Sequence, residues 1–430
     1  MNKPRFVISC PFDTYSGYGA RARDIVKAII ELDKYKVELL SQRWGETSWG
    51  FCNQNPEWKF LLNHLARPDW QKQKPDIWMQ ITIPNEFQPV GKYSIGLTAG
   101  IEATACKAEW VEGMNRMDLN LVSSEFTKVN FENMLYEKKN PQTQQVMGQV
   151  KLTKPIKTVF EGINLDVYKS IKQSEIKNIN LKQVPEQFCY LFVGHWMNGE
   201  LGHDRKNVGM LVKLFYEAFK NKRGPKPALI LKASTGVSSY ISRDQILNKI
   251  KQIRDSINAS DLPNIYLLTG EFSDQDMNEL YNHPKVKAML SLTKGEGFGR
   301  PLLEFSVTGK PIVASGWSGH MDFLNPEYVS LLPGSLEPIH PSASNDWLIK
   351  EAKWFKVSEP HVTTTLKNLY KHYKKFVEKS RKQKHFAKSN FSWEHMRDLV
   401  GDILEENIPE FPEQVELKLP SLNLPKLEKL

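Results

Sequence analysis

Residues 288–311 have the sequence A-M-L-S-L-T-K-G-E-G-F-G-R-P-L-L-E-F-S-V-T-G-K-P. It opens with the apolar run Ala288–Leu292, which is typical of a buried strand. Gly297 and Gly299 follow, and they allow a tight turn that can approach a ligand closely. Pro301 then favours the first turn of a helix. The segment therefore predicts a strand, a glycine-rich loop and a helix whose free amides suit an anion.

Two carboxylates stand in this segment. Glu296 lies on the loop and Glu304 in the first turns of the expected helix, so both can face one cleft. A carboxylate is a poor partner for an anion but a good acceptor for sugar hydroxyls. The alternative interpretation is that Glu296 is a turn residue and that Glu304 only favours the helix N-terminus.

Outward from this segment, short apolar runs alternate with helical patterns along most of the chain. In the second half the expected strands are Cys189–Gly194, Ala228–Ala233, Ile265–Thr269, Ala288–Leu292 and Pro311–Ser315. In the first half they are Arg5–Cys10, Lys36–Ser41, Asp76–Thr82, Tyr93–Thr98, Leu119–Ser123 and Ile156–Phe160, with helices at Ala20–Leu32, Pro56–Ala66 and Glu125–Tyr136. Continuous apolar strands alternating with helices predict α/β architecture with two Rossmann-like domains built on parallel sheets.

The weakly apolar segments between these runs set the expected boundaries. We expect a first domain at 1–170 and a second at 185–394, joined by the lysine-rich linker Lys169–Gln187. The polar stretch Glu137–Thr153 is expected to be a loop. The tail Ile408–Leu430 carries four prolines and is expected to be irregular and exposed.

Composition narrows the class of protein. The 430 residues are 40% hydrophobic and 25% charged, an ordinary globular balance, with a mean hydropathy of −0.46. No run reaches the ~18 apolar residues of a membrane span, and the N-terminus lacks the apolar region of a signal peptide. The four cysteines form no C-x-x-C pair, so a disulfide framework is not expected. A cytoplasmic protein fits best.

The net charge of +9 is partly local. Lys371–Lys388 contains eight lysines and arginines against Glu378 alone. One interpretation is a solvated helix face. The other is a surface for phosphates, in nucleic acid or in anionic lipid heads.

Three further motifs bear on a ligand site. His203–Val208 places Arg205 and Lys206 after a strand and before an amphipathic helix, where a guanidinium fork and a point charge suit a diphosphate. Gly17 and Gly19 form a glycine-rich turn after the first strand, which can hold a phosphate or a sugar or serve packing alone. His320 follows a strand of the second domain and is either a ligand contact or a loop residue.

Two metal-like patterns have simpler explanations. Asp274-Gln275-Asp276 is a D-x-D, but Ser273 before it reads as an N-cap, with both acids in the first helical turn. The ten histidines form no zinc-binding spacing. We therefore expect no dedicated metal and no cofactor beyond the substrate.

The segment Glu296–Glu304, followed by Gly-Lys-Pro-Ile-Val-Ala-Ser, resembles the donor site of the retaining GT-B glycosyltransferases, closest to glycosyltransferase family 4. His203–Val208 resembles the family's basic phosphate motif, although His195 stands where many members have arginine. Lys154–Tyr168 and Ser94–Phe126 resemble further family stretches. Asn390–Glu394 resembles the entry to the last family helix, which implies that 395–430 packs back on the first domain.

The resemblance implies a GT-B fold, in which two Rossmann-like domains face each other across a cleft, and it assigns roles. Glu296 would contact the transferred sugar, Glu304 the ribose hydroxyls, and Gly297, Phe298 and Gly299 the donor diphosphate and sugar. Arg205 and Lys206 would stabilise the leaving diphosphate. Thr269 is expected near the base. The residues expected on the acceptor side or in the cleft are Gly17, Gly19, Glu102 and His320.

We therefore expect a retaining glycosyltransferase that moves a hexose or pentose from a UDP- or GDP-sugar. Its acceptor is open: a glycan, a lipid-linked sugar, a protein, or a polyanion such as modified DNA. The alternatives are a nucleotide-sugar epimerase or hydrolase of the same fold and a non-catalytic module that binds sugar or nucleic acid.

Overall fold

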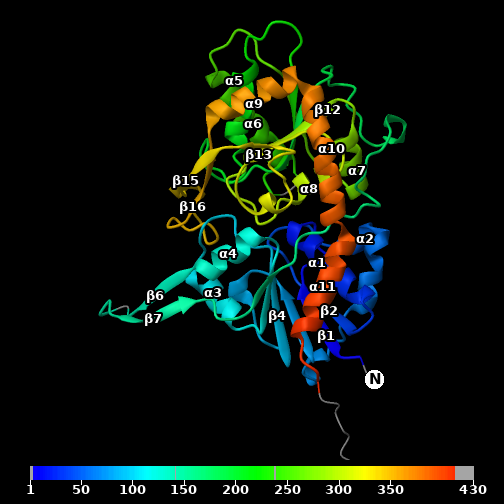
Figure 1. The fold of residues 1–430 in the computed structure, drawn as a ribbon, viewed down its shortest axis with the longest axis vertical. Coiled ribbons are helices and arrows are strands. Elements are labelled where there is room, and N and C mark those ends of the chain that lie inside the picture. The colour runs from blue at the N-terminus through cyan, green and yellow to red at the C-terminus, as the bar shows by residue number, and fades with distance from the viewer. Residues whose placement is uncertain (1–2, 141, 237–238, 412–430) are drawn as a thin grey trace, which may run out of the picture.

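Two six-stranded parallel sheets organise the chain, each in its own lobe, and the lobes are stacked along the long axis (Figure 1). The structure is a computed structural model that describes residues 3–140, 142–236 and 239–411. The α/β class and the two-sheet architecture expected from the sequence are confirmed. Within these described residues, no helix is long and apolar enough to cross a membrane.

The first sheet has the strand order β2-β1-β3-β4-β5-β8, and every neighbouring pair is parallel. Ile8 shows the register, since it lies between Leu39 and Met79. The strands are β1 (Arg5–Cys10), β2 (Lys36–Ser41), β3 (Ile77–Ile81), β4 (Tyr93–Thr98), β5 (Leu119–Val122) and β8 (Ile156–Thr158). The helices of this lobe are α1 (Gly17–Glu31), α2 (Phe51–Gln54), α3 (Ala108–Asn115) and α4 (Glu125–Asn133).

The second sheet has the order β11-β10-β9-β12-β13-β14 and is also parallel throughout. Its strands are β9 (Cys189–His195), β10 (Ala228–Ser234), β11 (Ile265–Leu268), β12 (Val286–Ser291), β13 (Ile312–Ser315) and β14 (Ser330–Leu332). Its helices are α5 (Val208–Phe219), α6 (Tyr240–Ser256), α7 (Asp274–Asn282), α8 (Arg300–Ser306), α9 (Glu359–Lys371) and α10 (Tyr373–Asn390). The antiparallel pair β15 (Gly334–Pro338) and β16 (Lys353–Val357) follows β14.

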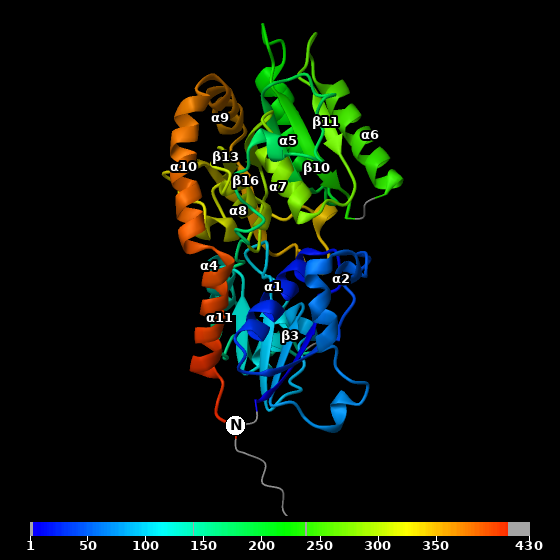
Figure 2. The same ribbon diagram turned by 90° about the vertical axis from the view of Figure 1, so that its right-hand side faces the viewer.

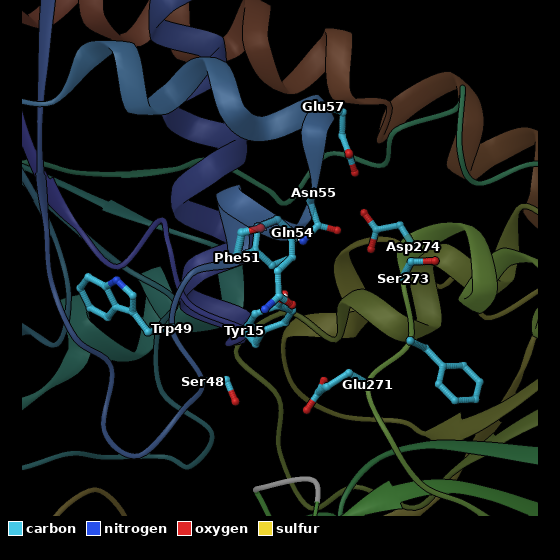
Figure 3. Close-up of a pocket in the computed structure, with 11 residues that line it drawn as sticks. Tyr15, Ser48, Trp49, Phe51, Gln54, Asn55, Glu57, Glu271, Ser273 and Asp274 are labelled. Atoms are coloured by element: carbon cyan, nitrogen blue, oxygen red, sulfur yellow. Dashed lines mark hydrogen bonds between the residues drawn. The ribbon is translucent and has the colours of Figure 1, made fainter.

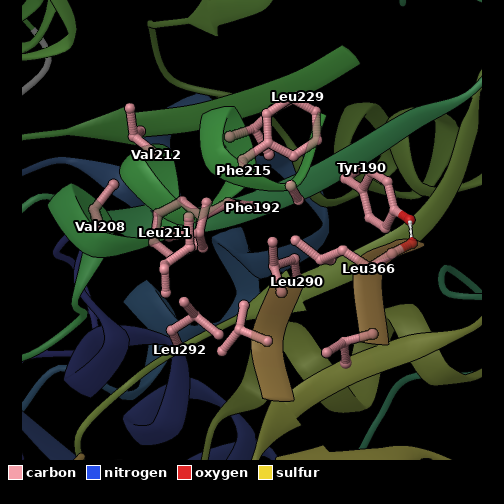
Figure 4. Packing of buried hydrophobic residues seen from close by; sticks show 14 of the residues in the cluster. Tyr190, Phe192, Val208, Leu211, Val212, Phe215, Leu229, Leu290, Leu292 and Leu366 are labelled. Carbon is pink, nitrogen blue, oxygen red and sulfur yellow. Dashed lines mark hydrogen bonds between the residues drawn. The ribbon is translucent and has the colours of Figure 1, made fainter. Parts of the chain in front are cut away.

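Each sheet is covered on both faces, which explains why its strands are continuously apolar. One face of the second sheet packs Tyr190, Phe192 and Leu229 against Leu211 and Phe215 of α5 (Figure 4). The Tyr190 hydroxyl donates a 2.7 Å hydrogen bond to the carbonyl oxygen of Leu366 in α9, so this buried polar group is satisfied. Its other face packs against α8, with Leu302, Leu303 and Phe305 all buried.

The last helix, α11 (Trp393–Asn407), leaves the second lobe and lies against α1 of the first (Figure 2). Its Trp393, Met396 and Val400 belong to the same buried cluster as Phe6 and Ile8 of β1. Of the tail expected to be irregular, 408–411 lies outside any helix or strand, and 412–430 lies outside the described residues.

The expected linker packs on the second lobe. Leu181 and Val184 are buried in the cluster that contains Leu191 of β9. The backbone N–H groups of 177–179 donate to the carboxylate of Glu279 in α7, at 2.7–3.2 Å. This segment is therefore held by both apolar contacts and hydrogen bonds, although it contains only one short 3₁₀ turn, Gln173–Glu175.

One expectation about local structure is wrong, and another is met by a different kind of helix. The stretch expected as a loop at 137–153 is part of an antiparallel hairpin, β6 (Leu135–Lys139) and β7 (Val146–Lys151), which projects from the first lobe (Figure 1). Almost all of its side chains are exposed, so it has no alternation of buried and exposed residues for a sequence pattern to reveal. The helix expected at 56–66 is present as a 3₁₀ helix, Pro56–His64, in which only Leu61 is buried.

Candidate functional site

The glycine-rich loop between β12 and α8 lies at the junction of the two lobes. The backbone N–H of Glu296 donates to Ser318 Oγ at 2.9 Å, and its carbonyl accepts from the Gly319 N–H at 3.0 Å. From the first lobe, Ser124 Oγ donates to the carbonyl oxygen of Gly297 at 2.6 Å. The loop is therefore fixed from both sides, which positions the Glu296 side chain.

The glycines of this loop are required by a close approach of the first lobe. A Cβ added at Gly297 would lie 2.5 Å from the carbonyl oxygen of Ala99, and one at Gly295 would overlap the carbonyl oxygen of Glu102. Real Cβ atoms do not approach so closely, so any larger residue here would push the lobes apart.

Glu296 sits in a buried cluster with the two cations of the His203–Val208 motif. Lys206 Nζ lies 2.6 and 2.7 Å from its two carboxylate oxygens, and Arg205 Nη1 lies 3.5 Å from Oε2. Arg205 also donates to the Gly295 carbonyl at 2.9 Å and lies 3.5 Å from the carboxylate of Glu102 across the junction. Burial alone would raise the pKa of Glu296, but Lys206 and Arg205 outweigh it and lower the pKa to about 2. Glu296 is therefore ionised and balances the cations.

Glu304 occupies a second cluster, one turn into α8. One of its oxygens accepts from Arg300 Nε at 3.0 Å and the other from the Tyr281 hydroxyl at 3.0 Å. Arg300 also donates to Asp24 of α1 at 2.6 Å, so Glu304 is linked to the first lobe. Burial raises the pKa of Glu304 to about 7, and Arg300 only partly offsets that rise.

Two adjoining cavities open between the lobes beside Glu304. One of about 310 Å³ has Gly17 and Asp24 of α1 on one side and Glu304, Arg300 and Tyr281 on the other. The second, of about 320 Å³, shares Tyr15 and Asp274 with the first (Figure 3). Its lining residues are Tyr15, Ser48, Trp49, Phe51, Gln54, Asn55, Glu57, Glu271, Phe272, Ser273 and Asp274. Together they form a cleft sized for a small ligand, with aromatic rings and carboxylates on its walls.

The remaining candidate residues divide into those near the cleft and those in the packing. Gly17 lines the cleft, whereas Gly19 is buried against the carbonyl of Thr14 and donates its N–H to Ser16 Oγ at 2.8 Å, inside the cap of α1. Thr269 is half-buried directly after β11. Phe298 turns its ring into the core, 4.9 Å from that of Phe323.

His320 is completely buried in a 3₁₀ turn, Gly319–Asp322. Its Nε2 lies 2.7 Å from the Ser315 carbonyl, and burial lowers its pKa. His195, which stands where the family pattern has arginine, contacts Ser234 Oγ at 2.9 Å instead of Glu296. Arg205 and Lys206 are thus the cations that contact this carboxylate in the described part of the chain.

The D-x-D motif caps a helix, as the sequence predicts. Ser273 Oγ accepts from the Asp276 N–H at 3.1 Å, and Asp276 accepts from the Ser273 N–H at 3.1 Å. Asp274 instead accepts from the Tyr168 hydroxyl at 3.0 Å. Within residues 3–140, 142–236 and 239–411, no group of three or more His, Cys, Asp or Glu side chains is arranged to hold a metal ion.

Sequence reasoning missed several residues of the cleft. Arg300 stands inside the decisive motif, and its position between Glu296 and Glu304 was a usable signal. No sequence signal distinguishes Asp24 or Tyr281, because acids and tyrosines are common within helices. Both come to Glu304 or its partner Arg300 only through tertiary packing.

The arrangement of the two sheets and the cleft defines a fold shared with known proteins. No protein-family model matches the sequence, and no curated protein is detectably similar to it in sequence. Among solved structures, sucrose-phosphate synthase from Thermosynechococcus elongatus is similar with a TM-score of 0.60 at 10% identity, over 94% of this chain and 99% of that one.

Two other structures are similar over the same share of this chain. Anabaena HepE in complex with UDP-glucose has a TM-score of 0.59 at 14% identity, over 94% of this chain and 100% of its own. The α,α-trehalose 6-phosphate synthase from Burkholderia multivorans has a TM-score of 0.58 at 10% identity, over 94% and 99%. The chain therefore has the GT-B fold, as the motifs predict.

Proposed function

We propose that this chain is a retaining glycosyltransferase of the family 4 type, which transfers a sugar from a nucleoside-diphosphate sugar to an acceptor. The observation that carries the proposal is the pairing of Glu296 with Arg205 and Lys206 on the loop that leads into α8, the helix whose Glu304 lines the cleft. These four side chains come from two loops and one helix of the second lobe, and the motif resemblance implies a role in donor binding or transfer for each. HepE, which shares the fold, is solved with UDP-glucose, which supports a UDP-sugar as the first donor to try.

In this proposal Glu304 accepts hydrogen bonds from the ribose hydroxyls of the donor. When the donor binds, Arg205 and Lys206 lose part of their contact with Glu296 and contact the diphosphate instead. The negative charge of the diphosphate grows as its bond to the sugar breaks. Glu296 then accepts from hydroxyls of the transferred sugar. The backbone of Gly297, Phe298 and Gly299 faces the donor diphosphate and sugar.

The acceptor enters from the first lobe, past Gly17. The bond between the anomeric carbon and the diphosphate oxygen breaks, and a bond to the acceptor oxygen forms on the same face of the sugar. The proton of the acceptor hydroxyl passes to an oxygen of the leaving phosphate. No metal is part of the proposal. The proposal includes a cytoplasmic location, because all four cysteines are free and buried.

A thermal-shift panel of UDP, GDP, ADP and their common sugars tests the donor site. A ligand at 100 times its dissociation constant stabilises a protein by about 2.7 kcal/mol, which is easily measured. One nucleotide should stabilise the wild type and Glu327→Ala, an exposed control in the same lobe, but not Glu304→Ala. Equal shifts in all three proteins would contradict the proposed donor site.

Turnover separates transfer from the alternative activities. With the nucleotide identified, Lys206→Ala and Arg205→Ala should each lower the rate by about 10²–10³-fold, because each removes one stabiliser of the leaving group. Product that forms only when an acceptor is present indicates transfer. Product without an acceptor would indicate an epimerase or a hydrolase, and an α-configured product from an α-linked donor would establish retention.

A further inference from the structure

The outer face of α10 concentrates positive charge away from the cleft. We define the α10 basic face as the exposed cations between Lys371, at the end of α9, and Lys388. Its members are Lys371, Lys374, Lys375, Lys379, Arg381, Lys382 and Lys388. In Figure 2, α10 runs along the outer edge of the second lobe.

These charges are not balanced by the protein itself. Over the described residues, none of the seven has a carboxylate within the 4.0 Å of an ion pair, although Glu378 lies on the same helix. On α6, by contrast, Lys251 pairs with Asp255 at 2.6 Å. Like charges one turn apart destabilise a helix, and Lys375, Lys379 and Lys382 form such a series within α10. The helix retains a repulsion that a bound polyanion would relieve.

A groove lies beside this face, at the edge of the sheet opposite the cleft. It has a volume of about 400 Å³ and is lined by Lys375 and Lys379 together with His372, Tyr328 and Phe376. It also includes Ile312 and Ser330, the first residues of β13 and β14, whereas Glu296 follows the carboxyl end of β12. The groove is therefore distinct from the candidate donor site.

The chemistry of this surface fits nucleic acid better than a lipid bilayer. A helix that lies on a bilayer buries a face of large apolar side chains opposite its basic face. Over the described residues, every exposed large apolar side chain lies outside α9 and α10. The 18 residues of α10 span about 27 Å, roughly the axial length of eight base pairs. The groove also offers two aromatic rings, Tyr328 and Phe376, and Lys382 Nζ lies 6.0 Å from the centre of the Tyr328 ring.

Charge also limits where such a polymer would lie. The next helix, α11, carries Glu394, Asp398, Asp402, Glu405 and Glu406. Glu405 pairs with Lys34 and Asp398 with Arg397, whereas the other three acids have no ion pair among the described residues. These three repel phosphates from the first lobe on this side, so the attraction weakens where α10 ends.

We propose that the α10 basic face binds nucleic acid through its phosphate backbone, at a site separate from the cleft. This goes beyond the proposed transfer activity and does not depend on it, because binding needs no donor. If the acceptor is nucleic acid, this face holds the polymer while another part of it reaches the cleft.

Fluorescence anisotropy with a labelled 25-base-pair DNA duplex, titrated over a range of salt concentrations, tests the proposal. The test variant is Lys375→Gln/Lys379→Gln/Lys382→Gln. The matched control is Lys59→Gln/Arg67→Gln/Lys74→Gln, which removes the same charge from exposed positions of the first lobe. Each lost phosphate contact lowers the salt slope by about 0.9, so the test variant should bind roughly 10²-fold more weakly at 0.1 M salt. The control should bind like the wild type.

Three results would overturn the proposal: equal losses in both triple variants, no binding by the wild type, or binding to anionic vesicles in place of DNA. A second measurement avoids any folding defect of the variants. Bound DNA should protect Lys375 and Lys379 of the wild type from acetylation but leave Lys59 and Lys74 reactive. The nucleotide thermal shift should be unchanged in the test variant, which keeps this proposal separate from the donor site.

Discussion

Glu296 is a buried carboxylate that balances two buried cations in the absence of a ligand. Its contacts with Lys206 at 2.6 Å and Arg205 at 3.5 Å involve side chains that are each 15% exposed or less. Removing one partner of a buried ionic group leaves the others uncompensated, at a cost of about 3–5 kcal/mol. The energetic role of this residue can therefore be separated from its role in turnover.

We predict that Glu296→Ala lowers the free energy of unfolding by about 3 kcal/mol and abolishes transfer. Inorganic diphosphate should stabilise the variant more than the wild type, because it neutralises the two cations that Glu296 otherwise pairs. Thermal denaturation with and without diphosphate measures both effects. A smaller diphosphate shift in the variant would mean that the cations do not face the ligand.

Glu304 is a carboxyl whose ionisation falls in the working range of pH. Its pKa of about 7 results from burial, and protonation turns one of its acceptor oxygens into a donor. Because ribose hydroxyls need acceptors, nucleotide affinity should fall roughly tenfold from pH 8 to pH 6.

Isothermal titration calorimetry measures this dependence at pH 6, 7 and 8, with the nucleotide that stabilises the protein in the thermal-shift panel. Glu304→Gln is the control, since it keeps the shape and an acceptor oxygen but does not titrate. The ratio of the two affinities cancels the titration of the phosphate itself. A ratio that does not change with pH would show that Glu304 is already ionised at pH 6. Folding stability depends on pH in the opposite direction from nucleotide affinity. Because the pKa of Glu304 is raised in the folded state, this residue stabilises the fold at low pH, and the contribution is lost as the pH rises through 7.

At the level of elements, the loop 293–299 determines how closely the lobes approach. We predict that Gly297→Ala moves the first lobe away from this loop, because the new Cβ would lie 2.5 Å from the Ala99 carbonyl. Overpacking of this kind costs about 1–3 kcal/mol. Small-angle scattering should show a larger radius of gyration, and activity should fall. Gly148→Ala on the exposed hairpin, where a Cβ has no neighbour within 4 Å, is the control.

A substitution at the N-terminus of α7 distinguishes a helix-capping role of the D-x-D motif from a metal-binding role. Ser273→Ala removes the cap and should lower the free energy of unfolding by about 1 kcal/mol. The loss should be the same with and without added Mn²⁺, because both aspartates already have hydrogen-bond partners. Asp274 accepts from Tyr168, and Asp276 accepts from Ser273. Strong stabilisation of the wild type by Mn²⁺ would contradict this interpretation.

Sequence predicts the buried elements well and the exposed ones poorly. All eleven strands expected from apolar runs exist in the two sheets, because burial leaves an apolar signal that is continuous in the central strands and alternates in the edge strand β2. Helix α1 begins at Gly17, three residues earlier than expected, because the Ser16 side chain caps it. The hairpin β6–β7 has little buried surface and thus no pattern. In the candidate site, a motif reveals Glu296 and Glu304, but only the packing of α1 on α8 brings Asp24 to Arg300.

For the whole molecule, the position of a segment along the chain does not determine the lobe in which it packs. The chain passes from the first sheet to the second and then returns through α11, whose apolar face completes the core of the first lobe. The two lobes are also joined across the cleft by Arg300 with Asp24 and by Arg205 with Glu102. Residues that belong to one lobe by sequence thus depend on the other for their surroundings.

This dependence predicts the effect of removing α11. Five of its side chains are buried in the first core: Trp393, Met396, Val400, Ile403 and Leu404. At about 1.5–3 kcal/mol each, their burial is comparable with the whole stability of a typical domain, about 5–15 kcal/mol. A chain that ends at Asn390 should therefore lose the tertiary structure of its first lobe, although every strand of the first sheet is still present.

Near-ultraviolet circular dichroism and binding of a hydrophobic dye measure that loss. A chain that ends at Phe411 keeps every contact described above and is the matched control. A separate peptide of residues 391–411, added in excess, should restore the signal, because it supplies the same apolar face without the connection through α10. Native-like dichroism in the chain that ends at Asn390 would mean that the first sheet and α1 form a sufficient core by themselves. Restoration by the peptide would instead show that α11 acts as part of the first lobe, and that α10 serves as its connection to the second.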